Sequence, residues 1–440
     1  MREGLRETRL KVGESGLKIE IRNGRVIDPA HNIDAKQSLF IASTMVAALG
    51  QAPDGFKPDR VIDAAGRIVC PGLVDLSVRL REPGYEYKAT LESEMLAAVA
   101  GGVTSLVCPP DTDPVLDEPG LVEMLKRRAS SLNRARVFPL GALTAGLRGE
   151  RLAEMVELAE AGCVGFFQAD HPLTDTNVLW RAMQYAATYG YSVWLRPQDA
   201  YLCADGVAHD GETASRLGLP AIPASAETIA IATILQLAEV TGARVHLARL
   251  SAAGSVAMVK EAKQRGLSVT CDVGIHHLHL SDRDIGYFDS RYRFTPPLRD
   301  PRDRDALRGG VLSGVIDAIC SDHTPLDDDA KLVPFGEAEP GATGLELLLP
   351  LTLKWAAEMK VPLAQALARI TSQPAQVLGI DAGHLGEGAV ADLCIFDPEA
   401  FWAVTPGTLL SQGKNSPYLG REVVGKVTQT LVAGQTVFPG

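Results

Sequence analysis

Alternation of hydrophobic and polar residues characterises the first part of the chain. In residues 17–29 apolar positions alternate with polar ones on both sides of Asn23-Gly24. Asn-Gly between two such segments is typical of a β-hairpin, because both residues tolerate positive φ. Short apolar segments follow at 38–41 and 60–62, and no long helical pattern precedes Pro71. The first 70 residues are therefore predicted to form a small β unit.

From residue 73 onward, short β-branched runs alternate with helical patterns. The predicted strands begin at Leu73, Ser105, Val137, Val164, Ser192, Arg244, Ser268 and Ile316. Helical patterns between them include residues 92–100, 152–161, 227–241 and 253–265. Eight strands with intervening helices predict a (β/α)₈ TIM barrel. An open doubly wound sheet is the alternative, but the Gly-rich phosphate loop usual in that fold is missing after the first strand.

Two long segments, 200–224 and 327–341, separate the regular elements. Loops of this length are unusual unless they cover a site or a partner, so both are expected at the catalytic rim of the barrel. Helices at 344–356 and 363–370 are predicted to end the barrel, and short strands return after Gly383, at 392–396 and 428–432. The Asp-rich stretches 300–305 and 327–329 are expected to be solvated loop faces rather than cation sites.

Composition and charge exclude several classes of protein. With 46% hydrophobic and 22% charged residues, the chain has the composition of a soluble globular protein. Its net charge of −11 argues against sequence-independent nucleic-acid binding. Seven cysteines without a Cys-x-x-Cys pair indicate neither a disulfide framework nor a thiolate zinc cluster. No apolar run is long enough for a membrane span, and the charged N-terminus lacks a signal-peptide core, so a cytoplasmic location is expected.

The stretch Pro71–Gly84 carries the most informative motif, a period-two strand that ends in Arg81-Glu82-Pro83-Gly84. It resembles the first barrel strand of the dihydroorotase branch of the cyclic amidohydrolases. In that family His-x-His precedes the arginine and begins a zinc site, whereas Ser77 and Arg79 stand at these two positions here. The resemblance implies an amidohydrolase-type barrel over residues 71–383, with a β-sandwich domain composed of residues 1–70 and 384–440.

The resemblance implies that the remaining metal positions are degenerate as well. The matching residues at later strand ends are Gln168, Arg196, Arg249 and Asp322. Only Asp322 retains the family's residue type, that of its catalytic aspartate. Asp170 lies two places beyond its expected position and is not expected to replace the lost acid, while His246 is expected to be a core residue. Arginine stays protonated and has no acceptor lone pair, so these positions oppose a divalent cation.

We therefore expect no zinc, no other cofactor and no catalytic residue, with Asp322 a vestige that pairs with at least one of Arg79, Arg196 and Arg249. Vestiges of substrate binding are Arg81, Asp111, His276 and Pro297. Asp111 replaces the family's asparagine and places an acid where the acidic substrate would bind, and Leu326 replaces its histidine. His276 and Pro297 belong to retained motifs, 276–278 and 296–299, whose expected role is structural. No Gly-x-Ser-x-Gly motif offers another nucleophile.

This pattern is similar to that of the noncatalytic dihydroorotase-like proteins. The resemblance implies a structural partner of aspartate carbamoyltransferase in pyrimidine biosynthesis, forming homo- or hetero-oligomers and binding neither nucleic acid nor membrane. A zinc-dependent dihydroorotase or related cyclic amidohydrolase with a rebuilt site is one alternative. A module that binds a small anion through the arginines is another.

Overall fold

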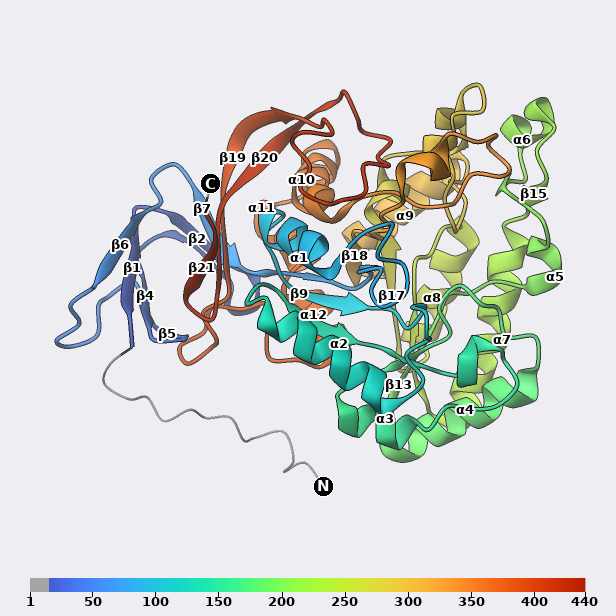
Figure 1. The fold of residues 1–440 in the computed structure, drawn as a ribbon, viewed down its shortest axis with the longest axis horizontal. Coiled ribbons are helices and arrows are strands. Elements are labelled where there is room, and N and C mark those ends of the chain that lie inside the picture. Colours follow the sequence, from blue (N-terminus) through green and yellow to red (C-terminus); the bar gives the residue numbers. More distant parts are fainter. Residues whose placement is uncertain (1–15, 440) are drawn as a thin grey trace.

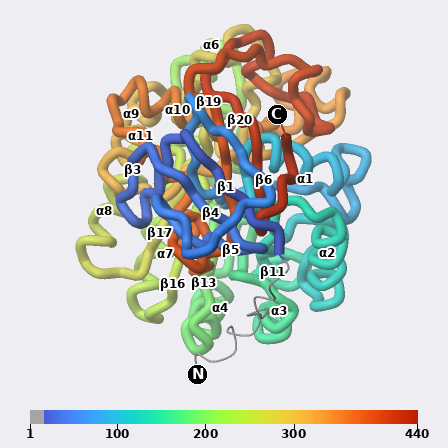
Figure 2. The backbone as a smooth tube through the Cα atoms, turned by 90° about the vertical axis from the view of Figure 1, so that its left-hand side faces the viewer, coloured from blue at the N-terminus to red at the C-terminus, as the bar shows by residue number. Residues whose placement is uncertain are grey.

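The computed structural model describes residues 16–439, which form a β unit beside a barrel (Figure 1). One sheet of the β unit has the order β5-β4-β1-β6, from strands Met45–Leu49, Leu39–Ala42, Lys18–Arg22 and Arg60–Asp63. The other has the order β21-β20-β19-β7-β2-β3, from strands Gln435–Pro439, Glu422–Val432, Leu393–Ala403, Ile68–Pro71, Arg25–Asp28 and Ile33–Lys36. Figure 2 shows strands of both chain ends side by side on this face of the molecule. The β domain built from both chain ends is confirmed, while its division at residues 70 and 383 stays a prediction.

Asn23-Gly24 joins two strands as predicted, but these strands do not form a hairpin. Strand β1 pairs with β4 and β6, whereas β2 pairs with β3 and β7. Asn23 adopts φ 65°, and a Cβ atom on Gly24 would come within 2.8 Å of Val69. The dipeptide therefore turns the chain from one sheet into the other. Burial of Ile19 and Val26 in one shared core between the sheets outweighs the local hairpin preference.

The barrel consists of short parallel strands. They are β8 (Leu73–Asp75), β9 (Val103–Cys108), β10 (Arg136–Pro139), β11 (Gly141–Ala142), β12 (Phe166–Phe167), β13 (Ser192–Leu195), β16 (Arg244–Leu247), β17 (Val269–Gly274) and β18 (Ala318–Cys320). Every ladder between them is parallel. A parallel bridge between Val78 and His323 brings the last strand end back to the first. The predicted barrel is confirmed, and each strand starts within a few residues of its predicted position.

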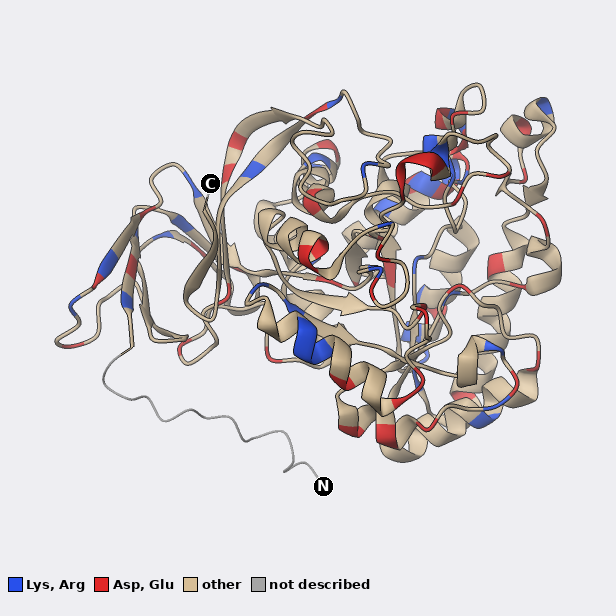
Figure 3. Cartoon of the chain, in the orientation of Figure 1, with Lys and Arg blue, Asp and Glu red and all other residues tan. Residues whose placement is uncertain are grey.

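Helices cover the outside of the barrel (Figure 1). They are α1 (Leu91–Ala100), α2 (Pro119–Ser131), α3 (Met155–Ala161), α4 (Thr176–Tyr189), α7 (Ser225–Thr241), α8 (Ala253–Gln264), α9 (Pro301–Ser313), α10 (Leu348–Met359), α11 (Leu363–Ala368) and α12 (Ser372–Leu378). Acidic and basic residues are interspersed over these helices (Figure 3). None of the helices in the described part of the chain is long and apolar enough to cross a membrane.

Two expectations about irregular segments are wrong. Segment 200–224 is not a plain loop but contains α5 (Ala200–Cys203), β14 (Ala208–His209), α6 (Glu212–Leu217) and β15 (Ala221–Ile222), and β14 pairs with β15. Cys203 and Ile222 are buried in a separate small core cluster, which explains why this segment has regular structure. The Asp-rich stretch 300–305 is not a solvated face throughout, because Asp300 caps α9 and Asp303 is buried. Segment 327–341 holds only the short helix η6 (Asp328–Lys331).

The junction of the two domains generates a stability prediction. Gly72 links β7 to β8, and a Cβ atom there would overlap the Thr104 side chain. Gly72→Ala is expected to destabilise the protein by about 1–3 kcal/mol, the usual cost of overpacking. Thermal unfolding monitored by circular dichroism measures this loss. The matched control is Gly120→Ala on α2, where nothing lies within 4 Å of the added atom; equal melting temperatures for the two variants would contradict the prediction.

Candidate functional site

The carboxyl ends of the barrel strands bring a set of charged residues to one mouth, as the barrel topology requires. The chain segments that follow β8, β12, β13, β16 and β18 contribute Arg79, Asp170, Arg196, Arg249 and Asp322, respectively. Arg249 and Asp322 are each only 2% exposed. These five side chains, called here the mouth cluster, include three of the positions at which the resemblance places lost metal ligands.

Asp170 is the centre of the mouth cluster. Its Oδ2 accepts a hydrogen bond from Arg79 Nη2 at 2.7 Å, and its Oδ1 accepts one from Arg196 Nε at 2.5 Å. Arg249 Nη2 donates to the same Oδ1, and Arg196 Nη2 donates to the Asp170 carbonyl oxygen at 3.2 Å. One carboxylate therefore binds guanidinium groups from three different strand ends.

Asp322 is the second acceptor of the cluster. Its Oδ1 receives a hydrogen bond from Arg249 Nη1 at 3.1 Å and lies 3.6 Å from Arg79 Nη1. The Ser77 hydroxyl also donates to this oxygen, at 3.4 Å. The expected pairing of Asp322 with an arginine is thus confirmed.

The charges in the mouth cluster shift one another's pKa values. Burial alone would raise the pKa of Asp170, but the guanidinium groups of Arg249, Arg196 and Arg79 hold it far below its usual range. Burial alone would lower the pKa of Arg249, but Asp170 and Asp322 raise it above its usual value. Both shifts favour the charged forms of Asp170 and Arg249, so the pair is ionic at neutral pH.

Asp111 and Arg81 lie at the same mouth but no longer form a binding pair for an acidic ligand. Asp111 Oδ2 accepts a hydrogen bond from Arg79 Nε at 2.8 Å. Arg81 Nε donates to the Pro325 carbonyl at 2.9 Å, and burial together with nearby Arg79 lowers the pKa of Arg81. Asp111 thus supplies a third acidic partner for the arginines, a role that its place in the sequence motif did not indicate.

The other predicted positions lie in packed surroundings. Gln168 is buried, accepts from the Thr144 hydroxyl and donates to the Leu147 carbonyl, both at 2.9 Å. Burial lowers the pKa of His276 to about 3, and neither of its ring nitrogens has a hydrogen-bond partner among residues 16–439. Pro297 lines a cavity of about 70 Å³ together with Arg196. The degenerate metal position assigned to Gln168 and the vestigial substrate-binding roles assigned to His276 and Pro297 stay predictions.

His246 is satisfied within the core, as expected. Its Nδ1 lies 2.9 Å from Thr270 Oγ1 and its Nε2 lies 3.1 Å from Asp272 Oδ2. The other oxygen of Asp272 accepts a hydrogen bond from the backbone of Arg249 at 2.6 Å. His246 therefore supports the strand end that carries Arg249 and is not available to a metal ion.

The residues present do not fit a zinc ion. Zinc in proteins binds thiolate, imidazole and carboxylate ligands. The mouth cluster offers two carboxylates, both already bound to arginine, and three guanidinium groups without a lone pair. A divalent ion at the position of Asp170 would face all three positive charges at contact distance. This donor set supports no metal-bound water.

Four residues at these strand ends have left-handed backbone conformations. Arg81, Ala169, Arg249 and Asp322 have φ values of 62°, 52°, 57° and 48°. This conformation is disfavoured for residues with a side chain, and such outliers gather at functional sites. Left-handed backbone is thus concentrated at the barrel mouth.

Asp170 is the residue that sequence reasoning missed. Its offset from the matched position argued against a role, yet three arginines predicted for one mouth require more negative charge than Asp322 alone provides. That charge count was the available signal. Asp170 supplies this negative charge. The loop after β12 turns at Ala169, whose φ is 52°, and this turn brings Asp170 into the mouth.

Two family models match overlapping parts of the chain. A family model described as "Dihydro-orotase-like" matches residues 66–255, and one described as "Amidohydrolase family" matches residues 172–438. A "Dihydroorotase-like protein" of Pseudomonas aeruginosa is 46% identical over 424 residues, covering 96% of this chain and 100% of that protein. A "Dihydroorotase" of Geobacter sp. strain M21 is 42% identical, covering 96% and 99%.

The fold is shared with solved structures at lower sequence similarity. The L-hydantoinase (dihydropyrimidinase) from Arthrobacter aurescens superposes with a TM-score of 0.85 at 23% identity, covering 96% of each chain. A structure of D-hydantoinase gives a TM-score of 0.80 at 22% identity, covering 96% of this chain and 95% of that one. These likenesses concern the barrel and the small β domain.

Because three arginines share the Asp170 carboxylate, replacing it with an amide of the same shape should lower the stability of the protein strongly. Asp170→Asn is expected to destabilise the protein by about 3 kcal/mol, because it leaves buried guanidinium charge without its main partner. Chemical denaturation measures the loss. Arg196→Met in the same chain should recover part of it, so the double variant should be more stable than additivity predicts. An Asp170→Asn protein with unchanged stability would disprove the central role of this carboxylate.

Asp75, the last residue of β8, has the opposite electrostatics. Asp75 is fully buried, its Oδ1 accepts from the backbone of Ser77 and Ser321, and its Oδ2 has no partner among the described residues. Burial raises the pKa of Asp75 from 3.8 to about 6. Because the folded pKa is raised, ionisation of Asp75 costs stability progressively as pH rises from about 4 to 6.

Asp75→Asn should therefore be more stable than the native protein above pH 6, by up to about 3 kcal/mol at 1.36 kcal/mol per pKa unit, and similar to it near pH 4. Unfolding curves across this pH range measure the difference. The matched control is Asp54→Asn, at an exposed side chain without an ion pair among the described residues. A stability difference that is constant from pH 4 to 8 would contradict the assignment to Asp75.

Proposed function

Because the chain belongs to the dihydroorotase-like family of amidohydrolases, we propose that it is a catalytically inactive member that acts as a structural partner of aspartate carbamoyltransferase in pyrimidine biosynthesis. The observation that carries the inactive assignment is the mouth cluster. Arginine side chains occupy the places of ligands and bind the only two carboxylates of the cluster. The family's hydrolytic nucleophile, a water acidified by metal, has no ligands on which to form.

A preserved framework beneath the altered mouth supports a structural role. Glu94 on α1 receives a hydrogen bond from the backbone of Gln412 at 2.9 Å, and His323 Nε2 lies 2.6 Å from its other oxygen. Burial alone would raise the pKa of Glu94, but His323 lowers it. This buried pair connects α1, the end of β18 and the segment before β20. Such a connection is costly unless it is fully satisfied, and here it is.

A second buried network secures the opposite side of the barrel. Glu227 on α7 accepts hydrogen bonds from the backbone of Ser251 and Ala252, each at 3.0 Å, and from the hydroxyl of Ser255 at 2.5 Å. These contacts anchor the start of α8 to α7. Around Glu94 and Glu227, the polar contacts that hold α1, α7 and α8 on the barrel are thus in place. A folded barrel with an altered site fits a function that uses its outer surface.

The names of the relatives do not decide between a scaffold and a hydrolase. One relative bears the name dihydroorotase-like protein and others bear the name dihydroorotase, so the names alone favour neither. The donor set of this chain favours the scaffold. We place the interface on the rim loops or outer helices, since the mouth itself is filled by ion pairs.

The proposal predicts a stable complex. The purified protein mixed with aspartate carbamoyltransferase of the same organism at micromolar concentration should co-elute in size-exclusion chromatography, since specific interfaces bury about 1,200–2,000 Å². Its dihydroorotate turnover should stay at background with and without added zinc. Ser77→His with Arg79→His serves as the control for the pocket and should leave assembly unchanged. Separate elution with unchanged transcarbamoylase activity, or zinc-dependent turnover well above background, would overturn the proposal.

A further inference from the structure

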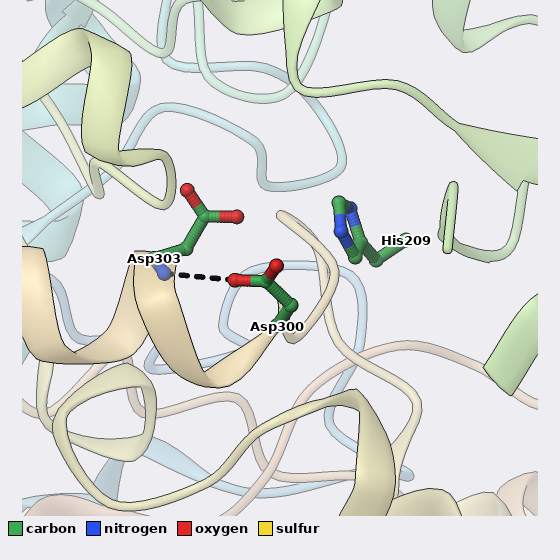
Figure 4. Close-up of side chains that lie close together, drawn as sticks. All are labelled: His209, Asp300 and Asp303. Atoms are coloured by element: carbon green, nitrogen blue, oxygen red, sulfur yellow. Dashed lines mark hydrogen bonds between the residues drawn. The ribbon is translucent and has the colours of Figure 1, made fainter. Parts of the chain in front are cut away.

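A second group of chemically suitable side chains lies outside the mouth cluster, around the start of α9 (Figure 4). His209, Asp300 and Asp303 each present one ligand atom, and these atoms lie within 4.8 Å of one another. Asp300 and Asp303 come from α9 and His209 comes from β14, in the segment that sequence patterns predicted to be a loop. The group, called here the rim cluster, therefore exists only because segment 200–224 folds against the barrel.

Each aspartate of the rim cluster uses one oxygen for a structural task and keeps the other. Asp300 Oδ1 caps α9 by accepting the backbone N–H of Asp303 at 2.9 Å, the bond drawn in Figure 4. Asp303 Oδ1 accepts the backbone N–H of Ala253 at the start of α8, at 2.7 Å. Helix capping explains one oxygen of each residue. It does not explain why two carboxylates and an imidazole converge.

A buried carboxylate near the rim cluster, that of Asp282, lacks a partner for one of its oxygens. It is 4% exposed, and its Oδ1 has no hydrogen-bond partner within residues 16–439. Gly211 lies near both side chains: a Cβ atom added there would be 3.8 Å from Asp282 Oδ2 and 3.5 Å from His209 Nε2. A buried carboxylate normally has donors or a cation, so an unpartnered one beside the rim cluster indicates a missing positive charge.

The charges around the rim cluster are unbalanced. Three carboxylates, of Asp282, Asp300 and Asp303, stand against Arg299, whose Nη1 is 3.3 Å from His209 Nδ1. Arg299 is also committed elsewhere, to the Ile222 carbonyl at 2.9 Å, to the Ser251 hydroxyl at 3.0 Å and to the Glu227 carboxylate at 3.9 Å. Carboxylates therefore outnumber the guanidinium group at these contacts, which favours a cation beside them.

The contact of His209 with Arg299 leaves one ring nitrogen for an ion. Since Arg299 has no acceptor, it faces Nδ1, and Nε2 is the nitrogen left for an ion. Ligation through Nε2 requires the ring proton to move to Nδ1, which weakens the 3.3 Å contact while Arg299 keeps its bond to Ile222.

We propose that His209, Asp300 and Asp303 bind one divalent metal ion of the class that accepts both imidazole and carboxylate ligands, such as Mn²⁺ or Zn²⁺, with the buried carboxylate of Asp282 as a neighbouring acid outside the ligand set. The ion joins β14 to the start of α9, near the short helix η4 (Asp282–Ile285). It is structural, because none of the three ligands forms a hydrogen bond with Asp170 or Asp322 among the described residues. The site goes beyond the proposed scaffold function and does not depend on it.

The test is metal binding by the full chain after dialysis against a chelator. Titration with MnCl₂, followed by electron paramagnetic resonance and calorimetry, should show one ion per chain, and ZnCl₂ should compete for it. His209→Gln and Asp282→Asn should each weaken Mn²⁺ binding by about 10-fold or more. Both variants spare the oxygens that cap α8 and α9, so they should fold. A rise in melting temperature on adding Mn²⁺ should appear in the native protein and disappear in both variants.

Two controls make the result specific. Asp305→Asn removes a charge from the same helix at a side chain that is 62% exposed and pairs with Arg304, and it should leave Mn²⁺ affinity unchanged. Asp322→Asn, in the mouth cluster, should also leave it unchanged. Absence of saturable binding up to about 1 mM Mn²⁺ would overturn the site and identify His209 as a donor to the aspartates. Equal affinity in the His209→Gln protein would overturn it as well. Neither outcome bears on the complex with the carbamoyltransferase.

Discussion

The sharing of one carboxylate by three guanidinium groups is the interaction on which the barrel mouth depends. Isolated buried charges are costly, and a buried pair loses several kcal/mol when one partner is removed. Arg79, Arg196 and Arg249 approach from three strand ends, and their charges are tolerable only because Asp170 lies between them. Asp322 and Asp111 complete the balance from the other sides. Electrostatic cross-links thus hold the strand ends of the mouth together.

The rest of the molecule provides a frame for this arrangement. Buried carboxylates on α1 and α7 attach helices to strand ends through complete hydrogen-bond sets. The β domain joins both ends of the chain in one sheet, with β7 running directly into the first barrel strand. The frame and the mouth are separable: the frame has the fold of the solved hydantoinase structures, and the mouth carries arginine at three positions where the resemblance implies metal ligands. The proposed scaffold role needs only the frame.

Sequence patterns predicted the frame better than the contacts within it. Barrel strands were recognisable because each buried run alternates with an amphipathic helix, and both periods are local properties. Asn23-Gly24 misled because the same dipeptide serves a hairpin and a corner, and only the core shared by Ile19 and Val26 decides between them. Segment 200–224 misled because its order depends on the small core of Cys203 and Ile222, formed with Ala226 on α7. Asp170 and Asp303 were undervalued because side-chain partners from distant strands and helices set their roles.

At the strand ends, left-handed backbone sets the direction of a side chain, and the residue type sets its chemistry. At Ala169, Arg249 and Asp322 the backbone bends in the conformation that directs groups toward a common point, whatever side chains are present. The barrel therefore directs side chains from different strands to one point within hydrogen-bond distance of one another. The residue type at each position then decides the chemistry at that point. Such a mouth is a starting point for design, because donors for a new ion or anion could be installed on directions that the fold already fixes.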